Sequence, residues 1–415
     1  MPQAKGNNGL LGLQYESPLA FGVDPSVPDL TKVYFETEGF KASTNLITSN
    51  VMTGTRQVSK PLQGNIDCTG AISTELGAYP GMLFYGAAGS IKTEAILGTG
   101  ETVGAALTTP VPAIDATNLQ MSVAATAHGL VIGDTVLIAG ITAPTALNNT
   151  YVRVIHVTSA NNFTVRIPFG VTGNITLGAG TLKKVTAPGQ SYKHTIKFGG
   201  VLPSFTVEKG FPDIAKFFKY NGLKIGKFSL NCTPEGAQKV SFDFIGKKET
   251  VGAVSFDSTA TDLGKASFTG FMSGSIEEGG VAIASLTKID ISGDNSLDGG
   301  IYVMGGAGTR NSIPEGSCKF SGSIEALFET SALYDKAVAG TESSLRVVYN
   351  RGTGVGTAGN ESFEIKLPEL MFKQETPTIS GDKGILYSGP FECYYDNSAE
   401  GVTAQIILLT PQLAI

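Results

Sequence analysis

The chain is poor in charged residues and contains no tryptophan. Charged residues make up 16% of its 415 residues, well under the usual ~25%, and the net charge is −6. This balance argues against tight nucleic-acid binding, which needs a concentrated basic surface, although it permits a smooth acidic surface past which DNA slides. The apolar runs, such as residues 406–409, are as long as a strand and far short of a membrane span. We therefore expect a soluble protein without a membrane partner.

Histidine and cysteine are also scarce. The four cysteines lie far apart in strand-like runs, which predicts buried thiols, with a structural disulfide as the less favoured alternative. No two of the three histidines have the spacing of a zinc site. Residues 1–9 lack the basic start and apolar stretch of a signal peptide, so we expect synthesis in the cytoplasm without export by that route. The scarce residues are Cys68, Cys232, Cys318, Cys393, His128, His156 and His194.

Glycine, by contrast, is abundant, with 53 residues beside 19 prolines. An interior glycine costs a helix roughly 1 kcal/mol relative to alanine, so this composition favours strands joined by tight turns. Apolar and polar residues alternate between Gly, Pro, Asn and Ser, as is typical of half-buried antiparallel strands. We therefore predict an all-β, multidomain protein. The expected strands include residues 32–37, 65–72, 193–198, 226–232 and 239–245.

Helix signals are few. Residues 211–218, which have a proline and an aspartate at their start, and residues 328–338 are predicted to form short helices. Residues 228–245 are predicted to form a hairpin with Pro234 and Gly236 in its turn.

Charge falls further between residues 101 and 188. The segment has about half the charge density of the whole chain, and linker-like residues flank it on both sides. Strand-like runs at residues 134–139, 151–158 and 162–167 predict a small β domain. Because the strand pattern before it resumes after it, we expect an insertion into another domain. The charged residues of the segment are Glu101, Asp115, Asp134, Arg153, Arg166, Lys183 and Lys184.

A sequence pattern occurs twice. A Gly-Thr-Arg motif ends at Arg56 and again at Arg310, and each is followed by a Gly-x5-Gly-small-Ile motif that ends at Ile72 or Ile324. Each copy follows a strand-like run and a polar stretch, which predicts a tandem duplication. The first unit would comprise residues 1–100 and 189–255, and the second residues 256–415. Each unit has a long polar loop, residues 42–60 and 295–313, that we expect a neighbour to order.

Two motifs resemble binding sites but lack required parts. Residues 354–359 have Gly-x-Gly-x-x-Gly spacing, yet a strand-like run follows where a pyrophosphate site needs a helix, so we interpret them as a mobile glycine loop. Residues 290–298 resemble a calcium loop but lack its sixth-position glycine and have Ile301 at its twelfth position, so we interpret them as a polar turn. We therefore predict no catalytic, metal-binding or cofactor-binding residues.

Residues 220–247, the pattern from Arg56 through Gly64 to Gly70, and the ending 389–396 resemble bacteriophage tail tube proteins, also called major tail proteins. Within the insert, the runs 128–140, 149–154 and 162–165 are similar to a small β module that recurs in phage structural proteins. Together these matches cover about two thirds of the chain. The match is weak over residues 343–390, which leaves the strand order of the second unit open.

The resemblance implies that each unit is a β-sandwich or partial barrel with a short helix. Subunits would close into rings with a continuous inner β-barrel, three duplicated chains replacing six, and the rings would stack into the tail of the virion. The lumen would carry the tape-measure protein and later DNA, with tail-end proteins as further partners and the insert projecting outward. The long loops would contact the adjacent ring or subunit, with Asn45, Thr48, Thr53, Arg56, Asn295, Tyr302 and Arg310 as the expected contact residues.

One alternative belongs to a different functional class. The chain could be an adhesive or carbohydrate-binding tail protein in which the insert binds the ligand. Such a role needs exposed aromatic side chains, and the insert has only Tyr151, Phe163 and Phe169, two of which fall at strand-core positions. An enzyme is not expected, because no active-site pattern is present.

Overall fold

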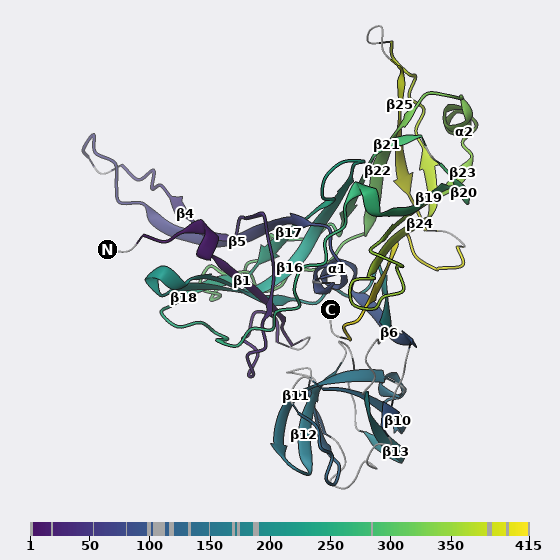
Figure 1. The fold of residues 1–415 in the computed structure, drawn as a ribbon. Coiled ribbons are helices and arrows are strands. Elements are labelled where there is room, and N and C mark those ends of the chain that lie inside the picture. Colours follow the sequence, from purple (N-terminus) through teal and green to yellow (C-terminus); the bar gives the residue numbers. More distant parts are fainter. Residues whose placement is uncertain are drawn as a thin grey trace.

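The computed structural model describes residues 3–17, 20–52, 54–79, 81–97, 101–102, 113–115, 120–131, 134–148, 150–167, 171, 175–185, 191–283, 285–379, 384–395 and 398–413. Strands dominate this part of the chain, and the predicted all-β class is confirmed (Figure 1). Its two α-helices are short, α1 (Met82–Ala88) and α2 (Ala332–Ala339). Single 3-10 turns occur at η1 (Gly6–Asn8), η2 (Thr145–Leu147), η3 (Pro212–Ile214) and η4 (Gly270–Met272).

One extended antiparallel sheet, called the long sheet below, runs through the upper part of the molecule in Figure 1. Its strands are β3 (Thr37–Glu38), β4 (Lys41–Ile47), β5 (Leu62–Glu75), β16 (Lys216–Cys232), β17 (Lys239–Gly246), β21 (Leu286–Asp294), β22 (Lys319–Leu327), β24 (Ser362–Phe372) and β25 (Leu386–Cys393). The order is β4-β5-β17-β16-β21-β22-β25, with β3 beside β5 and the end of β24 beside β25.

Two further layers share strands with the long sheet. The first half of β24 and the first half of β16 each lie in one of these layers, so both strands connect the layers covalently. The second layer has the order β6-β14-β26-β24-β23-β19-β20, and the third has the order β2-β1-β15-β16-β18. Their remaining strands are β1 (Leu10–Tyr15), β2 (Thr31–Lys32), β6 (Ser90–Leu97), β14 (Ser191–Lys197), β15 (Phe205–Phe211), β18 (Lys248–Gly252), β19 (Ser273–Glu278), β20 (Val281–Ala282), β23 (Glu342–Asn350) and β26 (Gln405–Thr410).

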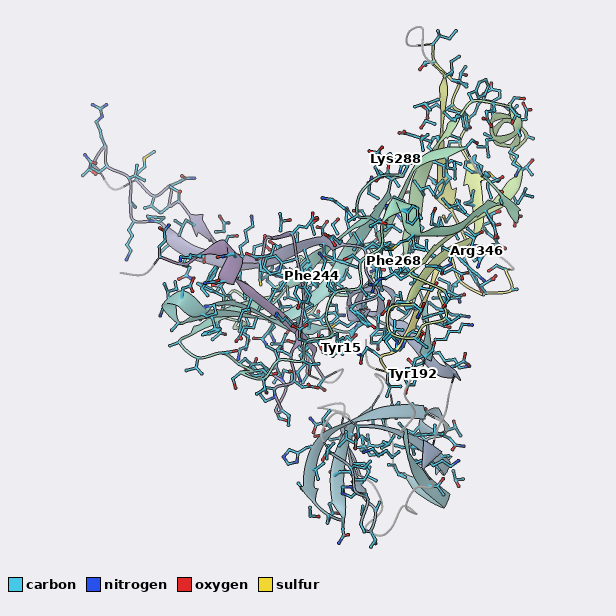
Figure 2. All side chains as sticks on the ribbon, viewed as in Figure 1. Tyr15, Tyr192, Phe244, Phe268, Lys288 and Arg346 are labelled. Atoms are coloured by element: carbon cyan, nitrogen blue, oxygen red, sulfur yellow. The ribbon has the colours of Figure 1, made fainter. Side chains whose placement is uncertain are left out.

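Aromatic side chains fill the space between the layers. Every residue of α1 is buried, and the ring centroid of Phe84 lies 5.4 Å from those of both Phe242 in β17 and Phe363 in β24. Phe244 and Phe268 lie in the same buried cluster (Figure 2). The long sheet is therefore covered on one side by α1 and the two other layers, and its opposite face carries exposed residues such as Ser229 and Asp243.

The structure corrects two sequence predictions. Residues 211–218 form no α-helix: η3 makes a single turn, Ala215 adopts a left-handed conformation with φ of 48°, and the chain reverses so that Phe211 pairs with Lys216. Residues 32–37 form no continuous strand, because the backbone crosses between layers. Val33 N–H donates to the Leu11 carbonyl, whereas Glu36 N–H donates to the Ser73 carbonyl.

Other local predictions are confirmed. The hairpin at residues 228–245 is present, with Phe228 opposite Phe242. The second predicted helix, at residues 328–338, is present as α2, although it begins later, at Ala332, and ends at Ala339. Both elements combine a local turn or helix signal with a regular apolar pattern, which makes them predictable from sequence alone.

A separate seven-stranded sheet is formed within residues 101–185, drawn at the bottom of Figure 1. It contains strands at the three predicted runs and has its own buried cluster, which includes Val136, Val154 and Phe163. The linkers expected on either side lie mostly outside the described residues. The strands, in the order β7-β13-β10-β11-β12-β9-β8, are β7 (Glu101–Thr102), β8 (Ala113–Asp115), β9 (Gln120–Ala124), β10 (Thr135–Ala143), β11 (Thr150–Ser159), β12 (Asn162–Arg166) and β13 (Thr176–Val185).

The buried His194 of β14 predicts a pH dependence of stability. Its Nε2–H donates to the Gln412 carbonyl at 2.9 Å, and its Nδ1 accepts from Thr93 Oγ1 at 2.9 Å. Burial lowers the pKa of this imidazole from 6.5 to about 4, so the native state keeps it neutral. Because the unfolded chain takes up a proton first, stability is expected to fall by about 3 kcal/mol as the pH drops from 6.5 to 4. The loss should be measurable by urea denaturation across this range.

The matched comparison uses two substitutions. His194→Phe should flatten the dependence between pH 6.5 and 4, whereas His156→Phe, at an exposed position, should leave it unchanged. An equal slope in His194→Phe and the wild type would contradict the assignment of this acid sensitivity to His194.

Candidate functional site

The motifs that resemble binding sites are used for local structure. Residues 354–359 join β23 to β24 without a helix, and Gly354, Gly356 and Gly359 all have positive φ, as tight turns require. In the calcium-like loop, Asp290 pairs with Lys288 at 2.6 Å and Asp294 with Lys227 at 3.2 Å. The described residues contain no group of three side chains that could hold a metal. Neither motif therefore offers a ligand site.

The four cysteines are free thiols. Cys68 and Cys232 are buried, as predicted, whereas Cys318 and Cys393 are half-buried. Burial raises the pKa of the Cys232 thiol to about 12 and that of Cys318 to about 11. Since the thiolate is the nucleophile, these thiols are unreactive near neutral pH.

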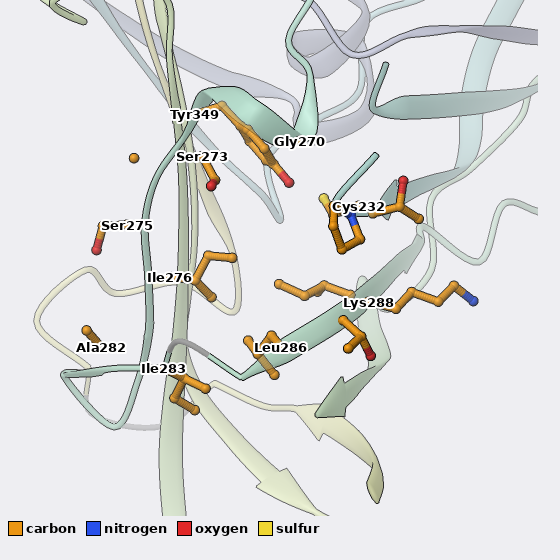
Figure 3. Close-up of a pocket in the computed structure, with 15 residues that line it drawn as sticks. Cys232, Gly270, Ser273, Ser275, Ile276, Ala282, Ile283, Leu286, Lys288 and Tyr349 are labelled. Carbon is orange, nitrogen blue, oxygen red and sulfur yellow. The ribbon is translucent and has the colours of Figure 1, made fainter. Parts of the chain in front are cut away.

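A cavity of about 430 Å³ lies beside the long sheet, at the junction with the second layer (Figure 3). Cys232, Tyr349 and Leu286 line it together with small polar residues, and the described lining includes no carboxylate or imidazole. Its only charged lining residue in this part of the chain, Lys288, is paired with Asp290. The cavity therefore lacks the paired acid and base of a hydrolytic site.

The open face of the long sheet is polar, and we call it the polar face. Along β17, Val240, Phe242 and Phe244 point into the core, whereas Ser241 and Asp243 alternate with them on the opposite side. Pairing places one serine of each of five neighbouring strands directly opposite the next, and we call this set the serine row. It consists of Ser73, Ser241, Ser229, Ser292 and Ser321, in the order β5-β17-β16-β21-β22.

Two cations on and around the polar face have acidic partners. Lys227 pairs with Asp294 across β16 and β21, and Lys239 lies 2.9 Å from Glu36. Exposed pairs of this kind contribute little to stability, but they prevent positive charge from accumulating. In the described strands, the polar face thus offers hydroxyl groups and interspersed charges of both signs, such as Asp243, Lys227 and Asp294, and no basic stripe that would hold a phosphate backbone.

The predicted contact residues of the first loop are exposed. Asn45, Thr48 and Arg56 lie on the β4–β5 hairpin, which extends away from the sheets in Figure 1. Thr53 lies outside the described residues. This hairpin therefore has surface available for a neighbour, and the contact role of these residues stays a prediction.

The contact residues predicted in the second loop bind within the chain. Asn295 is buried and donates to the Ala87 and Ile225 carbonyls, and the Tyr302 hydroxyl donates to the Ile66 carbonyl at 3.2 Å. Arg310 is also buried. The loop is thus ordered by the first half of its own chain, and any contact of these residues with another copy stays a prediction.

Arg310 anchors this loop. Its guanidinium donates to the carbonyls of Gly299, Cys68 and Gly246 at 2.6, 3.0 and 2.7 Å and pairs with the Asp67 carboxylate. The repeated motif includes Arg310, but no local sequence pattern predicts this anchoring role. The serine row was also missed, since pairing partners on five strands cannot be read from separate runs.

No helix among the described residues has the length and apolar character needed to cross a membrane. No curated protein matches the chain. Among solved structures, the chain is similar to the phage phi92 endosialidase at 8% identity and a TM-score of 0.14, a likeness too weak to support an argument. That alignment covers 86% of this chain and spans 59% of the other. The family of phage tail tube proteins matches residues 6–393. Since this match spans nearly the whole chain, the protein belongs to the phage tail tube family.

Proposed function

We propose that the chain is a non-enzymatic subunit of a phage tail tube, whose copies close into rings around a channel and stack. The serine row is the observation that carries the proposal. Five aligned strands present hydroxyl groups on a sheet whose other face is buried against α1 and the second layer. A surface of this kind can line a channel through which the tape-measure protein and DNA pass without being held.

The arrangement of strands supports two tube units per chain. The order β4-β5-β17 recurs as β21-β22-β25, in which β5 and β22 carry the Gly-small-Ile ends of the two copies of the repeated motif. We assign residues 1–100 and 189–255 to the first unit, residues 256–415 to the second, and residues 101–188 to an inserted domain. With two units per chain, three chains make a pseudo-hexameric ring. The rings assemble in the host cytoplasm, and in the virion the tube contacts the tail-end proteins.

The inserted domain is best assigned as an outward decoration. A carbohydrate-binding role would use exposed aromatic rings. Phe163 is buried in the core of the seven-stranded sheet, and Phe169 and the side chain of Tyr151 lie outside the described part of the chain. The structural role is therefore favoured over an adhesive one.

Electron microscopy of purified protein tests this proposal. The full chain is expected to form stacked rings of three chains, and a variant with residues 101–188 replaced by a short Gly linker should form rings of the same inner diameter. Monodisperse monomers of the full chain under all conditions would exclude the tube function. If only the deletion variant fails to assemble, the insert is part of the ring contact.

A further inference from the structure

The pairing of β16 with β21 joins the two halves of the long sheet. In the spatial order of the sheet, β16 lies next to β17 and is the last strand of the first half, whereas β21 is the first strand of the second half. On the polar face this junction pairs Lys227 with Asp294 and Ser229 with Ser292. The chain therefore contains one complete example of how the end of one unit pairs with the start of the next.

The two outer ends of the long sheet match the two strands of this junction. β4 has β5 as its strand partner within the described residues and is exposed along its length. At the other end, β24 ends at Phe372 and residues 373–379 follow it, exposed except for the half-buried Pro377. Lys373 N–H still donates to the Pro390 carbonyl at 2.8 Å. β4 thus occupies the position in the first half that β21 occupies in the second half. Residues 373–379 occupy the position in the second half that the second half of β16 occupies in the first.

We propose that β4 of one copy pairs antiparallel with residues 373–376 of a second copy, in the register of β16 and β21. The inference rests on the ring function proposed above. The partner of each free sheet edge is another copy of this chain, because the chain supplies both strands of the junction and the pairing of β16 with β21 shows that such strands pair. Exposed edges otherwise need protection from unspecific pairing.

The repeat sets the position of Lys41 in this register. Gly70 and Gly322 occupy the same place in the repeated motif, so Thr69 corresponds to Ser321. Lys41 lies opposite Thr69, and Ser292 lies opposite Ser321. Lys41 therefore corresponds to Ser292 of the internal junction.

The position of Glu375 follows from the other end. Ser241 lies opposite Ser73 in the first half. Glu325 is the repeat equivalent of Ser73 and lies opposite Ser388, so Ser388 corresponds to Ser241. The pairing of Phe372 with Phe391 and the bond from Lys373 to Pro390 set a register that, continued by two residues, would place Glu375 opposite Ser388. Since Ser229 lies opposite Ser241, Glu375 corresponds to Ser229.

The register therefore places Glu375 of one copy opposite Lys41 of the next. Opposite charges at directly paired positions stabilise strand pairing, whereas like charges weaken it. The pair would lie on the polar face, where Lys227 and Asp294 already form such a pair at the internal junction. The charges of the two free edges thus complement each other in this register.

The β4–β5 hairpin supports the same partner. Val51, Met52 and Val58 of this hairpin are 73%, 98% and 80% exposed, so it has apolar surface that a neighbour could cover. The equivalent loop of the second half packs through Tyr302 and Arg310 onto β5 and β17 of the preceding half. By the same geometry, the hairpin would lie on β22 and β25 of the neighbouring copy.

Cysteine cross-linking in the assembled full chain tests the register. Lys41→Cys combined with Glu375→Cys places two thiols at directly opposed positions, within reach of a disulfide. Oxidised tubes should yield a ladder of linked chains that ends at the closed ring. Lys41→Cys with Thr376→Cys, which points to the other face, and each single variant should yield none above the background of the native cysteines.

Charge reversal provides a second measurement. Glu375→Lys or Lys41→Glu alone should weaken each junction by about fivefold, seen as a higher protein concentration needed for tube formation. The double reversal should restore assembly. If the wild type forms tubes but the cysteine pair yields no cross-link, or if neither charge reversal changes assembly, the proposed register is wrong. The tube function would remain intact in both cases. Absence of tubes from the wild type would instead contradict the tube function.

Discussion

Replacing Arg310 with alanine is expected to lower the free energy of unfolding by about 3–5 kcal/mol. The guanidinium satisfies the carbonyls of Gly299, Cys68 and Gly246. Without it, three acceptors lose charge-assisted donors in a buried place, and the loop between β21 and β22 loses its anchor on the first half of the chain. Chemical denaturation of unassembled protein, followed by circular dichroism, measures this loss.

Arg56→Ala is the matched control for this substitution. Arg56 occupies the same position of the repeated motif, but its side chain is exposed on the β4–β5 hairpin. Its removal should change the stability of the unassembled chain by no more than about 0.5 kcal/mol. Equal effects of the two substitutions would contradict the anchoring role of Arg310.

Replacing Phe84 with alanine is expected to cost about 3–5 kcal/mol of stability. Its ring lies between Phe242 of the long sheet and Phe363 of the second layer, so truncation leaves a cavity where two sheets and α1 meet. The neighbouring rings belong to hydrogen-bonded strands and can relax only partly to fill the space. Because the chain has no tryptophan, tyrosine fluorescence and circular dichroism are suitable probes of unfolding.

Phe271→Ala serves as the control for the cavity. Phe271 is 95% exposed, so its removal takes no apolar area out of the core. Its stability should stay within about 0.5 kcal/mol of the wild type. A small loss in Phe84→Ala, similar to that of Phe271→Ala, would show that the layers are not held together through α1.

Local sequence patterns predicted the elements whose partners lie nearby in the chain. The hairpin between Phe228 and Phe242 needs only an alternating pattern and turn residues, and both are visible in the sequence. The helix expected at residues 211–218 failed for the opposite reason. Its proline and aspartate signal a helical start, but pairing of Phe211 with Lys216 extends two long strands and outweighs the local preference.

The sequence by itself determined the all-β class, the charge-poor composition and the recurrence of one motif, because these depend on residue type and spacing alone. Only the tertiary structure decided that five serines align across neighbouring strands and that Arg310 is buried whereas Arg56 is exposed. The two arginines have the same local motif, so no local rule separates them. The difference arises because β5 and β17 of the first half provide carbonyls for Arg310 of the second loop, whereas Arg56 lies exposed on the β4–β5 hairpin.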